Sequence, residues 1–239
     1  MKVSLVIPMY NEMSIIDDAI KTFSTYMNDN FEDWELIFVS DGSTDGCDVK
    51  VKEASEKDER IILAGYEVNR GKGCAVRTGI EKACGDIIIF TDCDNAYGEE
   101  TIKRAFDDLT GCDADILIGS RNLTKDGYQD YTFIRKLASK TYIKVIQLFA
   151  GFKLSDSQCG FKAFRHDAAK KIFRNCQVDR FAFDLEVILI ANKIGYKITE
   201  MPVKIVNHRE SKVNVVRDTF RMLSDLRKMK KRIKKQEII

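Results

Sequence analysis

The 239-residue sequence has no run of 18 consecutive apolar residues, so it offers no candidate membrane-spanning helix. Its first residues, MKVSLVIPMYNE, lead directly into a strand-like pattern, without the small-residue cleavage site of a secretory signal peptide. There are only two prolines and no linker rich in Pro, Gly or Ser. These absences predict one large domain that stays in the cytoplasm.

Cysteine and histidine occur without useful spacing. Seven cysteines are an odd number and none forms a C-x-x-C pair, so neither a disulfide framework nor a structural zinc site is indicated. The two histidines, His166 and His208, lack the spacing of metal ligands or of a base beside a nucleophile.

Charge is uneven along the chain, although the net charge is only +2. From residue 217 to residue 239 there are nine Lys or Arg and three Asp or Glu. The apolar residues here recur at helical spacing; they are Val216, Phe220, Leu223, Leu226, Met229 and Ile233. This basic amphipathic helix either lies on an anionic membrane surface or docks on its own domain. Nucleic-acid binding is not indicated, because only Phe220 could stack on a base.

Short β-type runs alternate with helix-length segments through the first half of the chain. The expected strands are 3–8, 35–40, 61–65, 86–91 and 115–120, and the expected helices are 12–27, 44–57, 72–84 and 99–109. This alternation predicts an α/β fold with a mainly parallel sheet covered by helices on both faces. The second half is less regular, with helices expected at 133–150, 167–175 and 184–194 and strands at 158–164 and 197–206.

The unusual polar residues follow the predicted strands, at the edge where ligands of such sheets collect. PMYNE follows the first strand, DGSTDG the second, DCDN the fourth and SR the fifth. Asp92 and Asp94 are two residues apart, so in an extended chain both carboxylates face the same side. Two carboxylates at the mouth of a sheet suit Mg²⁺ or Mn²⁺ completed by water and substrate phosphates. This predicts a site for a nucleotide diphosphate, although paired acids are also common on solvated loops.

Two phosphate-binding motifs are approached and not met. GKGCAV, residues 71–76, has valine where a dinucleotide-binding motif needs its third glycine. A P-loop is excluded as well, since Gly73 stands where serine or threonine is required and the glycine spacing is too long.

Seven blocks in order carry a resemblance to a known family; they are VSLVIPMYNE, VSDGSTDG, NRGKGCAVRTGIEKACGDIIIFTDCD, GSR, DSQCGFKAFR, FDLEV and NHRESKV. Together they resemble the family 2 glycosyltransferases of the GT-A fold, over about residues 3 to 225. The match is closest to the dolichyl-phosphate β-glucosyltransferases, with the dolichyl-phosphate mannosyltransferases next. Two features depart from those groups: many relatives carry membrane-spanning segments, and DCDNAY replaces their usual DADGAT or DADLQ.

The resemblance implies a role for individual residues of this chain. Donor-binding positions would be Pro8, Tyr10, Asn11, Glu12, Asp41, Arg70, Lys72, Asp92, Cys93, Asp94 and Gln158. Asp92 and Asp94 would act through the metal, and Asp156 would orient the acceptor or support the reacting sugar. Positions implied for the acceptor phosphate are Arg121, Arg135, Ser139, Arg209 and Lys212. Asp184 and Glu186, in FDLEV, would be second-layer ligands or acids at a helix start.

The resemblance thus implies a metal-dependent, inverting transfer of a sugar to a polyprenyl phosphate such as dolichyl or undecaprenyl phosphate. UDP-glucose is the expected donor, and a GDP-mannose enzyme or a transferase for a saccharide acceptor are alternatives. A non-catalytic nucleotide-sugar-binding subunit is a rival from another class. The expected organisation is a catalytic domain over 1–212 and a basic helix over 213–239, peripheral on the cytoplasmic face of a membrane, with a membrane subunit as a further partner left open.

Overall fold

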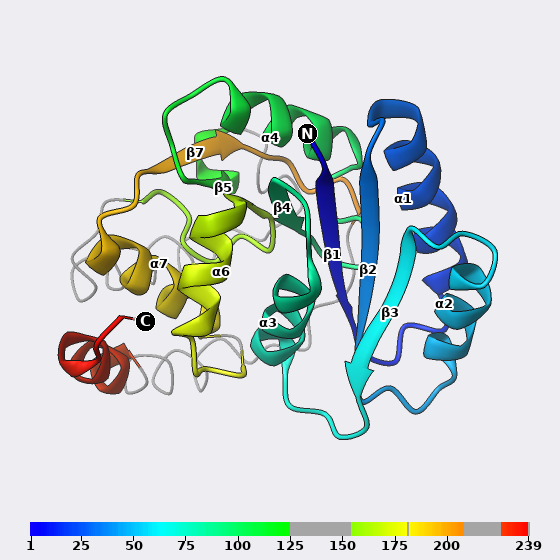
Figure 1. The fold of residues 1–239 in the computed structure, drawn as a ribbon, viewed down its shortest axis with the longest axis horizontal. Helices are drawn as coiled ribbons and strands as arrows, with labels where there is room; N and C mark the ends of the chain where they lie inside the picture. Colours follow the sequence, from blue (N-terminus) through cyan, green and yellow to red (C-terminus); the bar gives the residue numbers. More distant parts are fainter. Residues whose placement is uncertain (125–153, 181, 208–225, 239) are drawn as a thin grey trace, which may run out of the picture.

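A seven-stranded sheet forms the centre of the molecule, in the order β3-β2-β1-β4-β6-β5-β7 (Figure 1). The computed structural model describes residues 1–124, 154–180, 182–207 and 226–238. The strands are β1 (Val3–Met9), β2 (Trp34–Asp41), β3 (Ile61–Tyr66), β4 (Ile87–Phe90), β5 (Ile116–Ser120), β6 (Lys162–Arg165) and β7 (Ile198–Pro202).

The first four strands are parallel to one another, and β5 is parallel to β7. Among the strands that the structure describes, β6 alone runs against its neighbours, between β4 and β5. The prediction of a mainly parallel sheet is therefore confirmed. Five strands lie within two residues of their expected positions, because each is a continuous apolar run.

Helices cover both faces of the sheet (Figure 1). They are α1 (Ile16–Asn30), α2 (Cys47–Ser55), α3 (Lys72–Lys82), α4 (Glu100–Thr110), α6 (His166–Arg174) and α7 (Phe183–Ile194), with the 3₁₀ turn η1 (Arg121–Leu123) after β5. One core cluster joins α3, α6 and α7 to strand residues such as Val6 and Ile88. The other joins α1, α2 and α4 to the alternate residues, such as Leu5 and Ile89. Burial on both faces explains why these strands do not alternate with polar residues.

The strand expected at 158–164 begins later than predicted, at Lys162, and its four residues pair antiparallel with β4. Residues 157 and 158 form a turn, so only the second part of QCGFKAF can extend the sheet. The helix expected at 133–150 lies outside the described residues.

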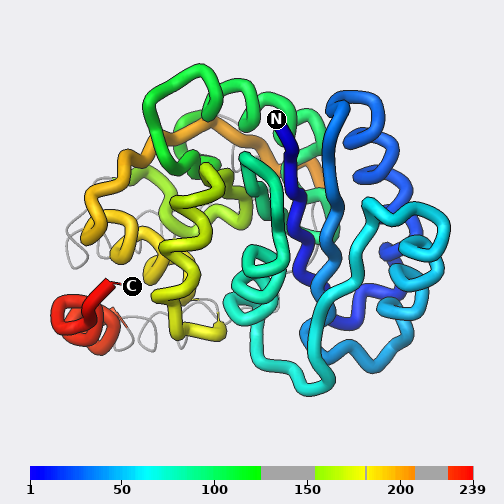
Figure 2. Tube along the Cα trace, in the orientation of Figure 1, coloured from blue at the N-terminus to red at the C-terminus, as the bar shows by residue number. Residues whose placement is uncertain are grey.

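Part of the basic C-terminal segment is described: residues 226–235 are helical. Leu226, Met229 and Ile233 are 1%, 4% and 4% exposed and belong to the core cluster of α3, α6 and α7. In Figure 2 this helix lies beside α6 and α7, on the side of the molecule away from α1 and α2. Of the two interpretations of the sequence, docking on the chain's own domain is the one realised for residues 226–235. The division into 1–212 and 213–239 stays a prediction.

All seven cysteines are free. Across the described ranges, no helix has the length and apolarity needed to cross a membrane.

Candidate active site

The loops after β1 and β2 are tied together at the carboxyl edge of the sheet. Asn11 has a positive φ of 54°. Its side-chain oxygen accepts a hydrogen bond from the Thr44 amide at 2.8 Å, and its own amide donates to the Ser43 hydroxyl at 3.2 Å. Asn11 therefore shapes this edge from within the chain. The preceding residue, Tyr10, is also a predicted donor-binding residue; it is 47% exposed, so its ring is accessible to a ligand.

Pro8 and Glu12 flank this turn and are both half-buried. The Glu12 carbonyl accepts hydrogen bonds from the amides of Ile15 and Ile16, each at 3.0 Å. The backbone of Glu12 thus helps to begin α1.

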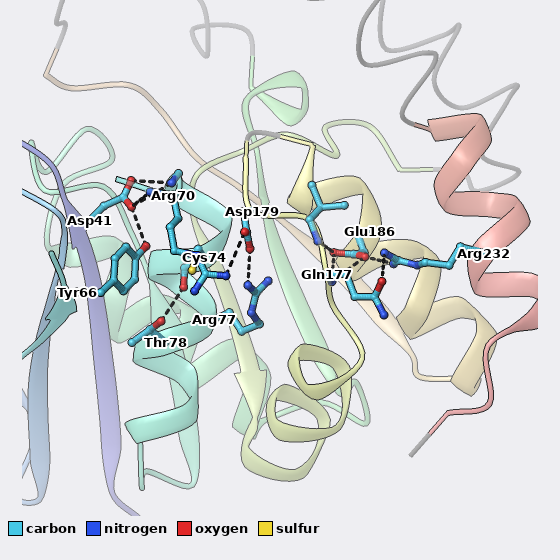
Figure 3. Close-up of polar contacts among 12 residues, drawn as sticks. Asp41, Tyr66, Arg70, Cys74, Arg77, Thr78, Gln177, Asp179, Glu186 and Arg232 are labelled. Atoms are coloured by element: carbon cyan, nitrogen blue, oxygen red, sulfur yellow. Dashed lines mark hydrogen bonds and ion pairs between the residues drawn. The ribbon is translucent and has the colours of Figure 1, made fainter. Parts of the chain in front are cut away.

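Asp41, at the end of β2, is only 4% exposed. Its carboxylate accepts hydrogen bonds from the Tyr66 hydroxyl at 2.7 Å, the Asn69 amide group at 3.0 Å and the Arg70 amide at 2.8 Å. The Gly71 amide adds contacts of 2.9 and 3.0 Å to the two oxygens. Asp41 therefore holds the loop between β3 and α3, as Figure 3 shows for its contacts with Tyr66 and Arg70. Burial and the neighbouring Cys74 and Asp41 raise the pKa of Tyr66, so the hydroxyl stays protonated as a donor.

Arg70 leaves this loop with a side chain that is 54% exposed. Its guanidinium lies 5.7 Å from the centre of the Tyr66 ring and 3.3 Å from an Asp179 oxygen. The Arg70 cation therefore lies between Tyr66 and Asp179 and keeps contact with water.

Lys72, the first residue of α3, pairs with Asp92 after β4. Burial alone would lower the pKa of Lys72, but the charges of Asp92, Asp184 and Asp94 outweigh it and raise that pKa. The lysine is therefore charged at neutral pH and neutralises part of the acidic pair. This contact joins two predicted donor-binding residues that are 20 positions apart in the sequence.

In the D-x-D segment, residues 92–94, the side chain of the central cysteine points in another direction from those of the two acids. Cys93 is 5% exposed and packs in the core cluster with α4, so its side chain points away from the sheet edge. The Asn207 side chain donates to the backbone carbonyls of Asp94 and Asn95 at 3.2 and 3.1 Å. The segment is thus anchored by Cys93 and Asn207, while the Asp92 side chain stays 31% exposed.

No group of three or more His, Cys, Asp or Glu side chains within the described ranges could hold a metal ion. Two carboxylates nevertheless fit Mg²⁺ or Mn²⁺ when substrate phosphate oxygens and water complete the shell, which is how these ions usually bind. Within this pair, one oxygen of Asp92 contacts Lys72.

On the other side of the edge, Arg121 follows β5 and forms a two-point ion pair with Asp156, at 2.6 and 3.0 Å. Asp156 is fully buried and Arg121 is 17% exposed at its side chain. Burial raises the pKa of an isolated carboxyl, but Arg121 outweighs this and lowers the pKa of Asp156. Asp156 is therefore an anion whose direct partner is Arg121.

A turn connects these two sides. The Gln158 amide contacts Asp156 at 3.3 Å, and the Gly160 amide donates to the Tyr97 hydroxyl at 3.0 Å. A Cβ atom on Gly160 would lie 2.4 Å from an Asp92 oxygen, so this backbone touches the acidic pair. The turn from 156 to 160 therefore spans the distance between Arg121 and Asp92.

A match to a known protein family identifies the family of this chain. The model of the family described as "Glycosyl transferase family 2" matches residues 4–173. The chain belongs to this family. It is therefore a family 2 glycosyltransferase, an enzyme with the expected GT-A architecture.

Two dolichyl-phosphate beta-glucosyltransferases are similar to this chain along most of its length. The dolichyl-phosphate beta-glucosyltransferase ALG5D of Trichomonas vaginalis is 32% identical over 226 residues, covering 89% of this chain and 68% of the relative. The dolichyl-phosphate beta-glucosyltransferase of Dictyostelium discoideum is 30% identical over 235 residues, covering 93% and 72%. The similarity stated from the sequence motifs is thus confirmed.

Among solved structures, the glucosyl-3-phosphoglycerate synthase of Mycobacterium tuberculosis in complex with Mn²⁺, UDP and glucosyl-3-phosphoglycerate matches with a TM-score of 0.69. The match covers 94% of this chain and 79% of that one at 16% identity. At that identity it supports the fold alone.

Three residues of this family 2 glycosyltransferase were missed by the sequence reasoning. Lys162 is fully buried, pairs with Asp184, and donates to the Cys159 carbonyl at 2.6 Å. Glu200 accepts the Ser155 amide at 2.8 Å and the Asp156 amide at 3.2 Å. Tyr97 anchors Gly160 as described above. Their partners are distant in sequence, so a local motif gives no signal for them.

Asp184 and Glu186 both lie in the first turn of α7, and both also contact other elements. Burial raises the pKa of Asp184, although Lys162 and Lys72 act against it. The acceptor residues expected at Arg135, Ser139, Arg209 and Lys212 lie outside the described residues.

Proposed function

We propose that this glycosyltransferase moves glucose from UDP-glucose to a polyprenyl phosphate such as dolichyl or undecaprenyl phosphate, with inversion at the anomeric carbon. The observation that carries the proposal is one edge of the sheet with an acidic pair, Asp92 and Asp94, beside a charged Lys72, and a rigidly held Arg121 across the turn. The likeness to dolichyl-phosphate beta-glucosyltransferases supports the sugar and the lipid class.

The part of the site that would bind the nucleotide sugar is proposed from the charges of its side chains. Tyr10 and the loop held by Asp41 would receive the nucleotide, with Arg70 and Lys72 facing its diphosphate. Asp94, with Asp92, would hold Mg²⁺ or Mn²⁺, which when bound supplies positive charge to the departing nucleoside diphosphate. That neighbouring solved structures contain Mn²⁺ and UDP supports a divalent cation in this family fold.

The part of the site that would bind the acceptor phosphate is proposed from the guanidinium group of Arg121. Arg121 can give two hydrogen bonds to phosphate oxygens, a geometry that lysine lacks. Asp156 and Glu200 would act as positioning residues, because Asp156 orients Arg121 and Glu200 holds the backbone of Ser155 and Asp156.

In the reaction, an acceptor phosphate oxygen forms a bond to the anomeric carbon while the bond from that carbon to the UDP oxygen breaks. The electron pair leaves with UDP. A phosphate is already anionic at neutral pH, so the attacking atom requires no strong general base. A single displacement inverts the anomeric centre.

The described part of the tail does not present its apolar residues to a membrane. The inward residues of the helix at 226–235 are buried in the core, and the outward ones are the exposed basic residues Arg227, Lys228, Lys230, Lys231, Lys234 and Lys235, called here the basic face. We propose that the basic face binds anionic lipid headgroups electrostatically.

The test of the reaction is a transfer assay with purified protein, Mn²⁺ or Mg²⁺, a polyprenyl phosphate in detergent and one radiolabelled donor at a time. The donors are UDP-glucose, UDP-galactose, UDP-N-acetylglucosamine and GDP-mannose. Label in the lipid phase from UDP-glucose alone is the expected result. Label from GDP-mannose alone would overturn the donor, and label in a saccharide acceptor but never in lipid would overturn the acceptor class.

A further inference from the structure

Glu186 is a buried junction between three segments of the chain. Its carboxylate, with no exposed surface, accepts hydrogen bonds from the amides of Gln177 at 3.0 Å and Val178 at 2.8 Å. It also pairs with Arg232 of the C-terminal helix, and Arg232 donates to the Gln177 side-chain oxygen at 3.1 Å. Figure 3 shows Arg232 reaching from that helix to Glu186 and Gln177. Glu186 thus fixes the loop 176–180 to both α7 and the C-terminal helix.

The same loop packs against the start of α3. The Asp179 carbonyl accepts the Cys74 amide at 3.1 Å. A Cβ atom on Gly71 would lie 2.6 Å from the Asp179 carbonyl oxygen, and one on Gly73 would lie 2.6 Å from that of Val178. The two glycines of GKG therefore serve close packing of this loop rather than a phosphate cradle.

The Asp179 side chain extends the connection to two arginines. One oxygen pairs with Arg77 of α3, and the other lies 3.3 Å from Arg70. Between these two arginines in the sequence stands Lys72, the partner of Asp92. Contacts thus connect the loop 176–180 to the cations of the predicted donor site.

The C-terminal helix is held well enough to act as an anchor. Lys193 of α7 donates to the carbonyls of Ile233 and Gln236 near the end of the helix. The Gln236 side chain donates to the Asn175 carbonyl at 3.1 Å, just before the loop. These contacts, with the buried apolar residues, fix where Arg232 stands.

We propose that Arg232 and Glu186 are positioning residues that couple the docked C-terminal helix to the donor side of the active site through Asp179. A buried carboxylate that loses its charged partner becomes costly to keep in place. Without Arg232, Glu186 keeps the amides of Gln177 and Val178 but loses its charged partner, so the loop that supplies those amides is held less firmly. Arg70, Lys72 and Arg77 then lose their fixed positions.

The test combines amide hydrogen exchange of the free enzyme with the kinetics of both substrates. Arg232→Ala is compared with Arg174→Ala, which removes the same side chain from an exposed position on the neighbouring α6. In Arg232→Ala, the amides of residues 69–76 and 177–179 should exchange faster, and those of β1 and α1 should not. The KM for the nucleotide sugar should rise on the order of tenfold, with the KM for the lipid acceptor unchanged. Arg174→Ala should leave all of these at wild-type values.

A second variant guards against general unfolding. Asp179→Asn breaks the side-chain pairs with Arg70 and Arg77 and leaves the C-terminal helix alone. It should raise the donor KM as well, while the amides of 226–235 exchange as in the wild type. Arg232→Lys keeps the charge but cannot contact both Glu186 and Gln177. In the double variant with Asp179→Asn, the donor KM should rise by less than the product of the increases in the two single variants.

The coupling is overturned if exchange at 69–76 is unchanged in Arg232→Ala, or if Asp179→Asn leaves the donor KM unaltered. The kinetic half rests on the proposed function and the exchange half does not. If no nucleotide sugar is turned over, the proposed function fails, while the exchange pattern still decides the coupling.

Discussion

Gly160 lies so close to Asp92 that a Cβ atom on the glycine would be 2.4 Å from a carboxylate oxygen. A side chain at position 160 would therefore displace the Asp92 carboxylate, which belongs to the predicted donor site.

Gly160→Ala should push the Asp92 carboxylate away from Lys72 while the fold is retained. The expected loss in kcat/KM is on the order of a hundredfold, because a shift of about 1 Å in a reacting geometry has that effect. Steady-state kinetics and a thermal unfolding curve provide the measurement. Gly111→Ala, at the end of α4 where a Cβ would be 3.1 Å from the Asp107 carbonyl, is the control. Equal activity in both variants would contradict the role of Gly160.

Asp94→Asn should abolish the gain in nucleotide affinity that a divalent cation gives. An amide oxygen carries no charge, so it binds a hard cation more weakly than a carboxylate does. Calorimetric titration with UDP, with Mn²⁺ and then with chelator, measures the gain directly. Asp108→Asn, on the exposed side of α4, should retain it. If UDP binds Asp94→Asn and the wild type alike under both conditions, the D-x-D assignment is wrong.

Lys162→Met should lower the free energy of unfolding by about 3–5 kcal/mol, since it leaves the buried Asp184 without its partner. The double variant Lys162→Met with Asp184→Asn should recover part of this loss, because no buried charge then remains at the pair. Urea unfolding of the two variants and the wild type gives the comparison. A single variant as stable as the wild type would show that the pair has no structural role.

The sequence predicted the first half of the fold well because the signals there are local. Each parallel strand is a continuous apolar run, and the acidic pair follows directly after one of them. The glycines of GKG were harder to interpret, because their reason is a loop about 100 residues away. The same limit applies to Lys162 and Glu200, whose partners are separated from them by 22 and about 45 positions.

For Asp156 and Cys93, the motif predicts where the residue lies but not where its side chain points. The resemblance assigns both residues to the site, and the backbone of both lies next to it. Asp156 faces Arg121 from a buried position, and Cys93 faces the core. Side-chain direction depends on packing from α4 and β5, which a motif does not contain.

Glu35 carries a pH-dependent part of the stability. Burial raises its pKa, but the Cys84 amide, the Ser4 hydroxyl and Lys2 outweigh this, so the pKa is lowered on folding. A carboxyl with a lowered pKa stabilises the fold above its unfolded pKa of about 4.3, and that stabilisation is lost as the pH falls through the folded value. Glu35→Gln should thus cost about 1–3 kcal/mol at neutral pH, and its difference from the wild type should shrink below about pH 4. A difference that is constant from pH 7 to pH 3, measured by urea unfolding, would contradict this.

The proposed binding of the basic face to membranes should depend on charge and salt, since the apolar residues of that helix are already buried. Replacing Lys228, Lys231 and Lys235 by glutamine should weaken binding to vesicles containing phosphatidylserine by about a hundredfold at low salt, at roughly 1 kcal/mol per lysine. The loss should shrink as salt is added, because the interaction is screened. A control with glutamine at Lys52, Lys57 and Lys82, which are exposed on other elements, removes the same charge from elsewhere. Vesicle sedimentation measures both variants, and the unfolding temperature should stay constant in both. Equal weakening by the two sets would reduce the effect to net charge, and equal binding to neutral vesicles would show that the contact is apolar after all.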